Sequence, residues 1–309
     1  MRIAVMATGG VGGYFGAKLA QGGHDVSFVA RGSHLAAMRE RGLTVKSRSG
    51  DIRIARPTLA EDPGTLGPID VVLFAVKLWD TESAAHAIRP LVDKGAAVVP
   101  FQNGVESIDR IGAVVGATAV LGGAAYIAAT IDEPGVIAHT GTMARLRFGP
   151  VIASQQRAAE ALFAACKDSG IDAELSADIR RAIWEKFAFL AAFSGMTSVV
   201  RQPIGVVRAD PDSRAALEAA IREVWTLARA RGVVLADDFV TQQMKFADGL
   251  PAEMRSSMQN DLALGHRLEA PWLCGAVARM AGAAGVEAPV NATLYATLKP
   301  YCAGTAHPN

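Results

Sequence analysis

The sequence contains very little cysteine and no histidine pattern typical of a metal site. Only three cysteines occur in 309 residues, and their wide separation matches neither a disulfide framework nor a zinc motif. The six histidines show no paired spacing on a helix and no nearby pair of cysteines. We therefore expect free thiols, no bound metal and a reducing, cytoplasmic environment.

A marked excess of charge of either sign is also absent. The 31 Lys and Arg residues nearly cancel the 30 Asp and Glu residues, so the whole chain has no basic excess for a phosphate backbone or an anionic membrane. Half of the residues are hydrophobic and 20% are charged, a mixture typical of a globular protein with a substantial core. A nucleic-acid partner is not expected.

The N-terminal sequence MRIAVMATGG lacks the basic region and the cleavage site of a secretory signal. One uncharged stretch, residues 111–131, is long enough to cross a bilayer. Four glycines interrupt it, and alanine and threonine dominate its apolar content. The pattern favours the end of a helix followed by a buried strand, so we expect no membrane span.

Short apolar runs alternate with amphipathic segments through the first half of the chain. β-Branched residues gather in four runs that are too short for buried helices, residues 3–6, 26–30, 71–76 and 96–101. Residues 33–41 and 81–92 lie between them and have a helical pattern; Ser33 can cap the first of these helices. This alternation predicts a doubly wound parallel sheet, that is, a Rossmann-type α/β domain.

The second half is rich in Ala, Leu and Arg and predicts an all-α domain. Helices are expected at residues 154–169, 177–200, 211–231, 252–268 and 272–284. One helix ends near Ser169 and another begins near Asp178, so we divide the chain into a dinucleotide-binding domain, residues 1–175, and a helical substrate and catalytic domain, residues 176–309. The apolar surface of residues 272–284 suits either domain packing or a homodimer.

A glycine-rich loop, ATGGVGGYFGAKLA, directly follows the first expected strand. A dinucleotide site needs glycines there, because the loop must turn tightly and let its backbone approach the pyrophosphate. The following helix then directs its N-terminal amides at the anion. Ala7 replaces the first glycine of the fingerprint, a small change that we expect to reshape the turn without abolishing binding. The residues predicted to hold the pyrophosphate are Gly9, Gly10, Val11 and Gly12.

Arg31 directly follows the second expected strand, residues 26–30. An NAD-specific protein usually has Asp or Glu at this place for the ribose hydroxyls, whereas arginine suits the additional phosphate of NADP. The sequence therefore predicts NADP(H) as the cofactor. The alternative for Arg31 is a solvated cation in a loop.

Lys186 lies in the apolar segment IWEKFAFLAAFSGMTSV. Reducing a carbonyl requires a proton at oxygen as well as a hydride at carbon, so an acid must accompany the cofactor. Partial desolvation would lower the pKa of Lys186 and suit it to stabilising and protonating an incipient alkoxide. The alternative is a surface lysine whose ammonium group extends into solvent.

Five motifs, taken together and in order, resemble the ketopantoate reductase family over nearly the whole chain. They are GGVGGYFGAKLA, VKLWDT, FQNGVES, WEKFAFLAAFSGMTSV and RSSMQNDLALGHRLEA. The resemblance implies a Rossmann-type N-terminal domain, a helical C-terminal domain, and NADPH-dependent reduction of a small 2-keto acid in the cleft between them.

The resemblance also implies roles for individual residues. Lys186 matches the family's catalytic lysine and Glu269 its acidic partner, while Ser257 matches a serine that holds the substrate. Asn103 is similar to an asparagine at the junction of cofactor and substrate, and Lys77 to a lysine that lines the cofactor cleft. On their own, Asn103 would indicate a turn and Lys77 a surface residue at a strand end.

The sequence departs from the family pattern beside the catalytic lysine. Members that act on ketopantoate carry asparagines four and eight residues after it, on the same helix face; here these positions are Leu190 and Ser194. Leucine cannot hydrogen-bond to a substrate hydroxyl, and serine is shorter than asparagine. Reduction of ketopantoate in pantothenate biosynthesis is the first expectation. The alternatives are a D-2-hydroxyacid dehydrogenase of this family for a more apolar 2-keto acid, and a regulatory protein that binds NADP without catalysis.

Overall fold

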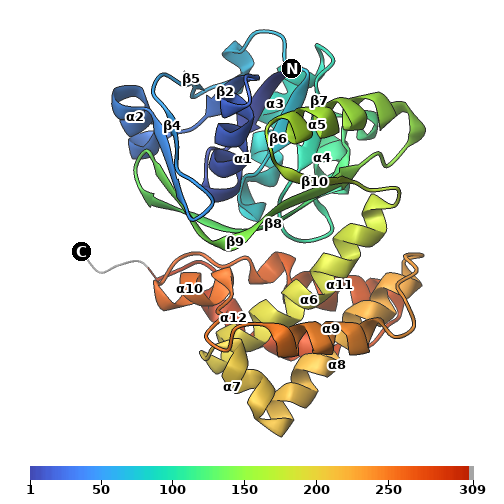
Figure 1. Cartoon of the computed structure of the whole chain (residues 1–309). Helices are drawn as coiled ribbons and strands as arrows, with labels where there is room; N and C mark the ends of the chain where they lie inside the picture. Colours follow the sequence, from blue (N-terminus) through green and yellow to red (C-terminus); the bar gives the residue numbers. More distant parts are fainter. Residues whose placement is uncertain (306–309) are drawn as a thin grey trace. The chain divides into compact units, whose positions relative to one another are not determined.

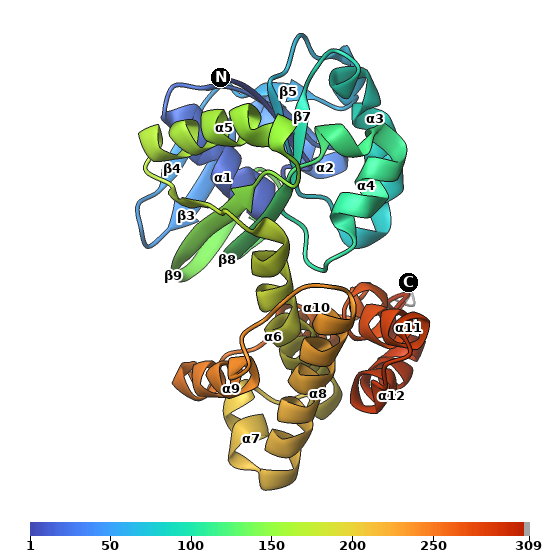
Figure 2. The same cartoon turned by 90° about the vertical axis from the view of Figure 1, so that its right-hand side faces the viewer.

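The computed structural model describes residues 1–305, which form two compact units, Met1–Ala182 and a second that begins at Ile183. The first unit combines sheets and helices, and the second consists of helices (Figures 1 and 2). The predicted fold class, a Rossmann-type α/β region followed by an all-α region, is confirmed.

A five-stranded parallel sheet forms the centre of the first unit, in the order β5-β2-β1-β6-β7. Its strands are β1 (Arg2–Met6), β2 (Asp25–Val29), β5 (Thr58–Ala60), β6 (Val71–Phe74) and β7 (Ala97–Pro100). Ile3 of β1 pairs with Val26 on one side and with Val71 on the other. The chain order therefore reverses at β1, and ligands of such sheets bind at the carboxyl ends of the strands beside this switch point.

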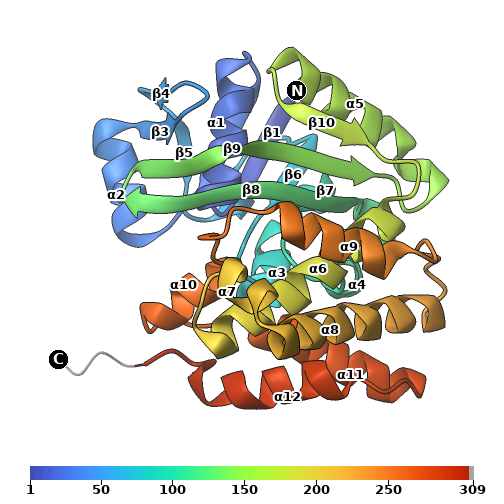
Figure 3. The same ribbon diagram turned by 60° about the horizontal axis from the view of Figure 1, so that its bottom comes forward.

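A second sheet forms around a long antiparallel hairpin, β8 (Gly122–Glu133) and β9 (Val136–Gly149), which Figure 3 shows along its length. The other edge of β9 pairs with β3 (Leu43–Ser47) and β10 (Asp172–Leu175), and β4 (Ile52–Ile54) extends the sheet beyond β3. The expected strand after a helix end is confirmed, since α4 ends at Val115 and β8 begins at Gly122, but only the first four residues of β8 are buried. Strand β10 was not predicted from the sequence, which indicated no strand after residue 149.

The first unit contains five α-helices, α1 (Gly10–Gln21), α2 (Gly32–Arg41), α3 (Thr81–Val92), α4 (Ser107–Val115) and α5 (Gln156–Asp168). Helix α1 is covered by both sheets, and its glycines permit this. A Cβ atom at Gly16 would lie 2.7 Å from the Val5 side chain of β1, and one at Gly13 would lie 2.8 Å from the Ile137 side chain of β9. The two sheets therefore approach α1 so closely that side chains at these positions would be excluded.

The second unit is built from α6 (Ile179–Val200), which begins in the first unit, and the helices that follow it: α7 (Ile204–Ala209), α8 (Pro211–Ala230), α9 (Phe239–Gly249), α10 (Ser257–Ala263), α11 (Cys274–Ala284) and α12 (Pro289–Leu298). Asp210 caps α8 by accepting a hydrogen bond from the Ser213 amide at 2.8 Å. Gly195 allows α12 to pack closely, because a Cβ there would lie 2.9 Å from Leu294.

The prediction of one helix over residues 252–268 is wrong for most of that range, because only Ser257–Ala263 is helical. The carbonyl groups of Ala252 and Met254 accept hydrogen bonds from the first amides of α7, at 2.9 and 3.0 Å, and so serve another helix. Ser256 then starts α10 by accepting from the Gln259 amide at 3.0 Å. Gly265, with a φ of +69°, turns the chain away after it.

Three further observations concern possible partners of the chain. No helix within residues 1–305 is long and apolar enough to cross a membrane. Among these residues, no group of three or more His, Cys, Asp or Glu side chains is arranged to hold a metal ion. The three cysteines are free thiols, and Cys166 and Cys274 are buried.

Candidate active site

Four loops meet at one edge of the parallel sheet, because each follows the carboxyl end of a parallel strand. They follow β1, β2, β6 and β7 in turn. The structure thereby brings the predicted cofactor residues of the first unit to a common edge. These are the loop Gly9–Gly12, Arg31, Lys77 and Asn103.

The glycine loop ends in the N-terminus of α1. Gly9 is the N-cap residue and has extended backbone angles, so the conformation itself does not demand glycine. A Cβ atom at Gly9 would meet nothing within 4 Å, so the fold supplies no steric reason for glycine there either. The first amides of a helix have no acceptor within the helix, and they favour an anion. Open space beside such amides fits a pyrophosphate at the start of α1.

Ala7 adopts a left-handed backbone conformation, with a φ of +71°. The position is locked by its neighbour, because both the amide and the Oγ1 of Thr8 donate to the Val29 carbonyl of β2, each at 3.0 Å. Alanine in this conformation carries a steric strain that glycine does not. Ala7 therefore adopts the backbone conformation that favours glycine at the first position of the glycine-rich loop.

We expect Ala7→Gly to raise the free energy of unfolding by about 1 kcal/mol, because the left-handed conformation costs an L-residue about 1–2 kcal/mol and glycine's larger unfolded-state entropy offsets part of the gain. Urea denaturation followed by circular dichroism measures this difference. Ala17→Gly, in the middle of α1, should do the opposite, since glycine lowers helix stability there. A loss of stability in Ala7→Gly would contradict the strain described here.

Arg31 forms an ion pair across the sheet edge. It is the N-cap residue of α2, and its Nη2 atom donates to Oδ2 of Asp80 at 3.0 Å. The Arg31 side chain is 82% exposed, whereas the Asp80 side chain is 31% exposed. Exposed pairs of this kind contribute little to stability, so the guanidinium group remains accessible to another anion.

The loops after β6 and β7 are tied together by a glutamine that the sequence analysis did not single out. The Gln102 Nε2 donates to the Val76 carbonyl and to Thr81 Oγ1, both at 2.9 Å. Its neighbour Asn103 is half-buried, and the exposed Lys77 holds its ammonium group 5.6 Å from the centre of the Trp79 ring. Gln102 thus fixes the loops that carry both predicted residues; its place directly before Asn103, after a strand, is the only sequence signal for it.

In the helical unit, Lys186 lies on α6 close in sequence to two buried aromatic residues, Trp184 and Phe187, whose rings meet edge to face with centres 5.8 Å apart. Burial lowers the pKa of Lys186 from 10.5 to about 8, and the negative charge of Glu269 partly opposes this. The amino group is therefore mainly protonated at neutral pH but loses its proton more readily than an ordinary lysine.

Glu269 is 7% exposed and stands at the start of a tight turn, Ala270–Trp272. Its carbonyl group accepts from the Trp272 amide at 3.0 Å, and the preceding residue, Leu268, donates its amide to the Cys302 carbonyl at 3.1 Å. Backbone contacts on both sides thus fix the position of the carboxylate. The carboxylate lies near enough to Lys186 for its charge to raise the pKa of that amino group, against the effect of burial.

Leu190 and Ser194 continue the face of α6 that carries Lys186, at intervals of four residues. Leu190 is half-buried. Ser194 is 1% exposed, and its hydroxyl has no hydrogen-bond partner among residues 1–305. A buried hydroxyl of this kind calls for a partner such as a ligand or an ordered water. Ser257, in contrast, is exposed at the first position of α10, and its neighbour Ser256 makes the contact with α6, 2.9 Å from Thr197 Oγ1.

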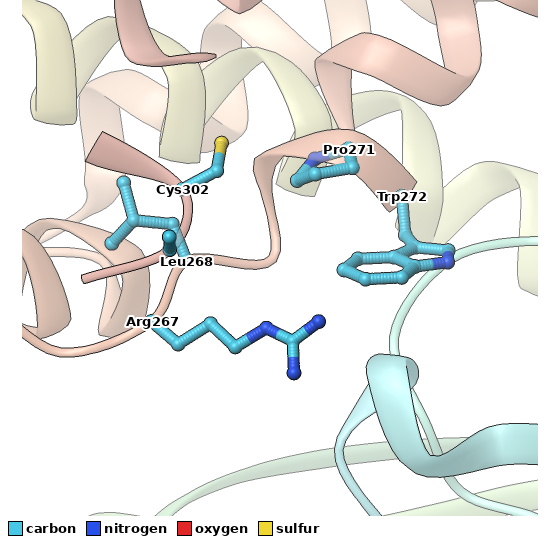
Figure 4. Close-up of a pocket in the computed structure, with 6 residues that line it drawn as sticks. Arg267, Leu268, Pro271, Trp272 and Cys302 are labelled. Atoms are coloured by element: carbon cyan, nitrogen blue, oxygen red, sulfur yellow. The ribbon is translucent and has the colours of Figure 1, made fainter. Parts of the chain in front are cut away.

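An open pocket of about 410 Å³ flanks the turn that carries Glu269. Figure 4 shows the guanidinium group of Arg267 and the indole ring of Trp272 at this pocket, with Cys302 and Pro271 on another side. Leu268 and Ala303 complete the lining. A cation and an aromatic ring beside Glu269 were not predicted from the sequence, which indicated only two helices, residues 252–268 and 272–284, on either side of Glu269.

Comparison with known proteins agrees with this architecture over nearly the whole chain. The family described as "Ketopantoate reductase PanE/ApbA" matches residues 3–152, and "Ketopantoate reductase PanE/ApbA C terminal" matches residues 178–301. The chain is 34% identical over 299 residues to a 2-dehydropantoate 2-reductase of Halobacterium salinarum, covering 95% of this chain and 96% of that protein. It is 30% identical over 303 residues to the uncharacterized oxidoreductase YkpB of Bacillus subtilis, covering 97% and 99%.

A solved structure is equally similar. The PanE/ApbA family ketopantoate reductase from Ralstonia eutropha JMP134 is 32% identical, with a TM-score of 0.89, covering 97% of this chain and 98% of that one. The similarity extends through both units rather than through the Rossmann-type part alone. The chain belongs to the ketopantoate reductase family, a family of oxidoreductases that act on CH–OH groups.

Proposed function

We propose that this protein catalyses the NADPH-dependent reduction of a small 2-keto acid to the 2-hydroxy acid, with ketopantoate, reduced to pantoate, as the first candidate substrate. The observation that carries the proposal is the burial of Lys186 in a largely apolar part of α6, which lowers the pKa of its amino group to about 8 while the charge of Glu269 partly opposes that shift. Such a group can donate a proton near neutral pH.

The loops at the edge of the parallel sheet support the cofactor part of the proposal. Gly9 leaves room for the pyrophosphate at the start of α1. The exposed guanidinium group of Arg31 follows β2, where the 2′-phosphate of NADP is recognised in Rossmann folds. We assign Lys77 and Asn103 to the nicotinamide half, since they follow β6 and β7 on the other side of the switch point. When bound there, the reduced nicotinamide supplies the hydride.

We assign the proton to Lys186. Its ammonium group donates a hydrogen bond to the keto oxygen, which makes the carbonyl carbon more electrophilic. As the carbon gains a hydride, the oxygen gains negative charge, and the Nζ proton passes to it to complete the hydroxyl group. Glu269 keeps Lys186 charged before the reaction and in position during it. Lys186 then regains a proton from solvent.

Ser194 and Leu190 support different substrates. The buried Ser194 hydroxyl has no partner within residues 1–305, so a polar substituent of the substrate, such as the hydroxyl of ketopantoate, would complete its hydrogen bonding. Leu190 offers an apolar surface on the same face of α6 and favours a second candidate, a branched or aromatic 2-keto acid. Initial rates of NADPH and NADH oxidation with ketopantoate and with branched and aromatic 2-keto acids test both. A lack of turnover across this panel, with the cofactor bound, would favour a regulatory NADP-binding role.

Leu190→Asn is expected to raise the ratio of kcat/KM for ketopantoate to that for an apolar 2-keto acid by about 10-fold or more, because an amide can bond a substrate hydroxyl and disfavours an apolar group. Steady-state kinetics with both substrates measure the ratio. Leu264→Asn is the matched control, since Leu264 is 60% exposed in the same unit, and its ratio should equal that of the wild type. An unchanged ratio in Leu190→Asn would exclude this position from substrate selection.

A further inference from the structure

Arg31 is bound by an acidic side chain from a different part of the chain. Arg31 follows β2 and Asp80 follows β6, and these two strands flank β1 in the sheet. The contact of 3.0 Å therefore spans the carboxyl end of β1, above the strand that leads into the glycine loop. A dinucleotide lying on that loop would have the adenosine ribose at the end of β2, beside this pair.

The two partners of the pair differ in how firmly they are held. Asp80 lies in a short turn, Leu78–Asp80, in which its amide donates to the Lys77 carbonyl at 2.9 Å. The Leu78 carbonyl in the same turn accepts from Arg110 at 3.1 Å and from Thr81 Oγ1 at 2.8 Å. The Asp80 carboxylate makes no capping bond to α3. The backbone around Asp80 is thus fixed, while the Arg31 guanidinium group is 82% exposed and can change its partner.

We propose that Asp80 is a specificity-determining residue for the cofactor, because its carboxylate competes with the 2′-phosphate of NADP(H) for Arg31. This inference rests on the proposed function and concerns its adenosine end. A 2′-phosphate carries close to two negative charges at neutral pH, so Asp80 both occupies the cation and repels the incoming group. A dinucleotide without that phosphate does not meet this opposition. Arg31 makes the protein bind NADP(H) more tightly than NAD(H), and Asp80 therefore reduces the ratio of these two affinities.

The test uses the full-length protein and two fragments of the cofactor, 2′,5′-ADP and 5′-AMP, whose binding is measured by isothermal titration calorimetry at low and moderate salt. We expect Asp80→Asn to bind 2′,5′-ADP about 5-fold more tightly than the wild type at low salt, with a smaller gain at higher ionic strength. Its affinity for 5′-AMP should stay within about twofold, because the substitution leaves the backbone bonds of the turn in place.

Two further variants decide whether the effect acts through Arg31. The double variant Arg31→Ala/Asp80→Asn should bind 2′,5′-ADP no more tightly than Arg31→Ala, because the guanidinium group for which Asp80 and the phosphate compete is gone. Asp93→Asn removes the same charge from an exposed residue at the C-terminus of α3 and should leave both affinities unchanged. An equal gain in Asp93→Asn, a gain that persists without Arg31, or weaker 2′,5′-ADP binding by Asp80→Asn would each overturn the proposal.

The same measurements distinguish an error in the proposed cofactor site from an error in the role of Asp80. If the wild-type protein binds neither fragment nor NADPH, the assignment of the sheet edge to a dinucleotide is wrong, and the role of Asp80 is wrong with it. If the fragments bind but Asp80→Asn shows no gain, the cofactor site stands and only the competition is excluded.

Discussion

Replacing Lys186 by alanine is expected to lower kcat/KM for keto acid reduction about 10³-fold, since loss of a proton donor and loss of a charge that stabilises an oxyanion each typically cost 10²-fold or more. NADPH affinity should change little, because the loops that we assign to the cofactor belong to the first unit. Initial-rate kinetics and NADPH titration separate the two effects. Turnover within a few-fold of the wild type would remove Lys186 from the chemistry.

A loss of activity through unfolding must be distinguished from a loss of the proton donor, because removal of Lys186 leaves the buried Glu269 carboxylate without its opposite charge. The double variant Lys186→Met/Glu269→Gln removes both charges and should retain the Tm more fully while remaining inactive. Lys245→Ala, at an exposed lysine on α9, is the matched control and should retain full activity. Recovery of activity in the double variant would contradict the assigned role.

The pH dependence of the reaction follows from the same residue. The pKa of Lys186 is lowered to about 8, so the amino group loses its proton as the pH rises through that value. We expect kcat for keto acid reduction to be level below about pH 7 and to fall above pH 8, while oxidation of the hydroxy acid should rise over the same range. Below pH 8 the lysine is charged in both the folded and the unfolded chain, so burial of its charge lowers the free energy of unfolding by a constant amount. As the pH rises from 8 toward 10.5, the folded chain has lost this proton while the unfolded chain still holds it, and the free energy of unfolding therefore rises.

The second large effect is expected from Gly12→Ala, which should lower the free energy of unfolding by about 3 kcal/mol. A Cβ at this position would overlap the Ala7 carbonyl oxygen and lie 2.8 Å from the Val5 side chain. Ala7 cannot move freely, because its φ is positive and the next residue is bound twice to Val29. Urea denaturation of wild type and variant measures the difference.

Gly9→Ala provides the matched comparison, three residues away in the same loop. Its Cβ would enter open space, so stability should change by less than about 0.5 kcal/mol, as for substitutions that make no clash. The same methyl group would occupy the space that we assign to the pyrophosphate, and NADPH affinity should fall by about 10-fold or more. Equal losses of stability in the two variants would contradict the distinction drawn between them.

Local patterns in the sequence were sufficient for four of the five strands of the parallel sheet, all but β5, and for most helices. Residues 3–6 and 71–76 are β-branched runs followed by helical segments, and a strand-helix alternation of this kind has few stable arrangements. The second sheet was largely missed, because β3 pairs with β9 across more than 90 residues and β10 is short. Such pairing depends on distant partners, which a local pattern does not contain.

Candidate site residues could be predicted where the type of side chain and its place in the sequence already indicate a role. A lysine in an apolar helix and an arginine at a strand end could be selected directly, as Lys186 and Arg31 were. Residues that act through a neighbour could not, because their contacts arise only on folding. Gln102 is an ordinary glutamine until it joins two loops, and Asp80 an ordinary acidic residue until it meets Arg31.

The burial of α1 between two sheets has a consequence for the order in which the chain becomes functional during synthesis. The first 100 residues contain all five strands of the parallel sheet, yet they leave uncovered the part of α1 that packs against β8 and β9. Its other cover, the hairpin Gly122–Gly149, is translated only later. Until these residues have left the ribosome, Gly10 lacks its contact with Ala129 and Gly13 its contact with Ile137. The nucleotide loop therefore reaches its final shape well after its own sequence has been made, and early nascent chains should not capture cofactor.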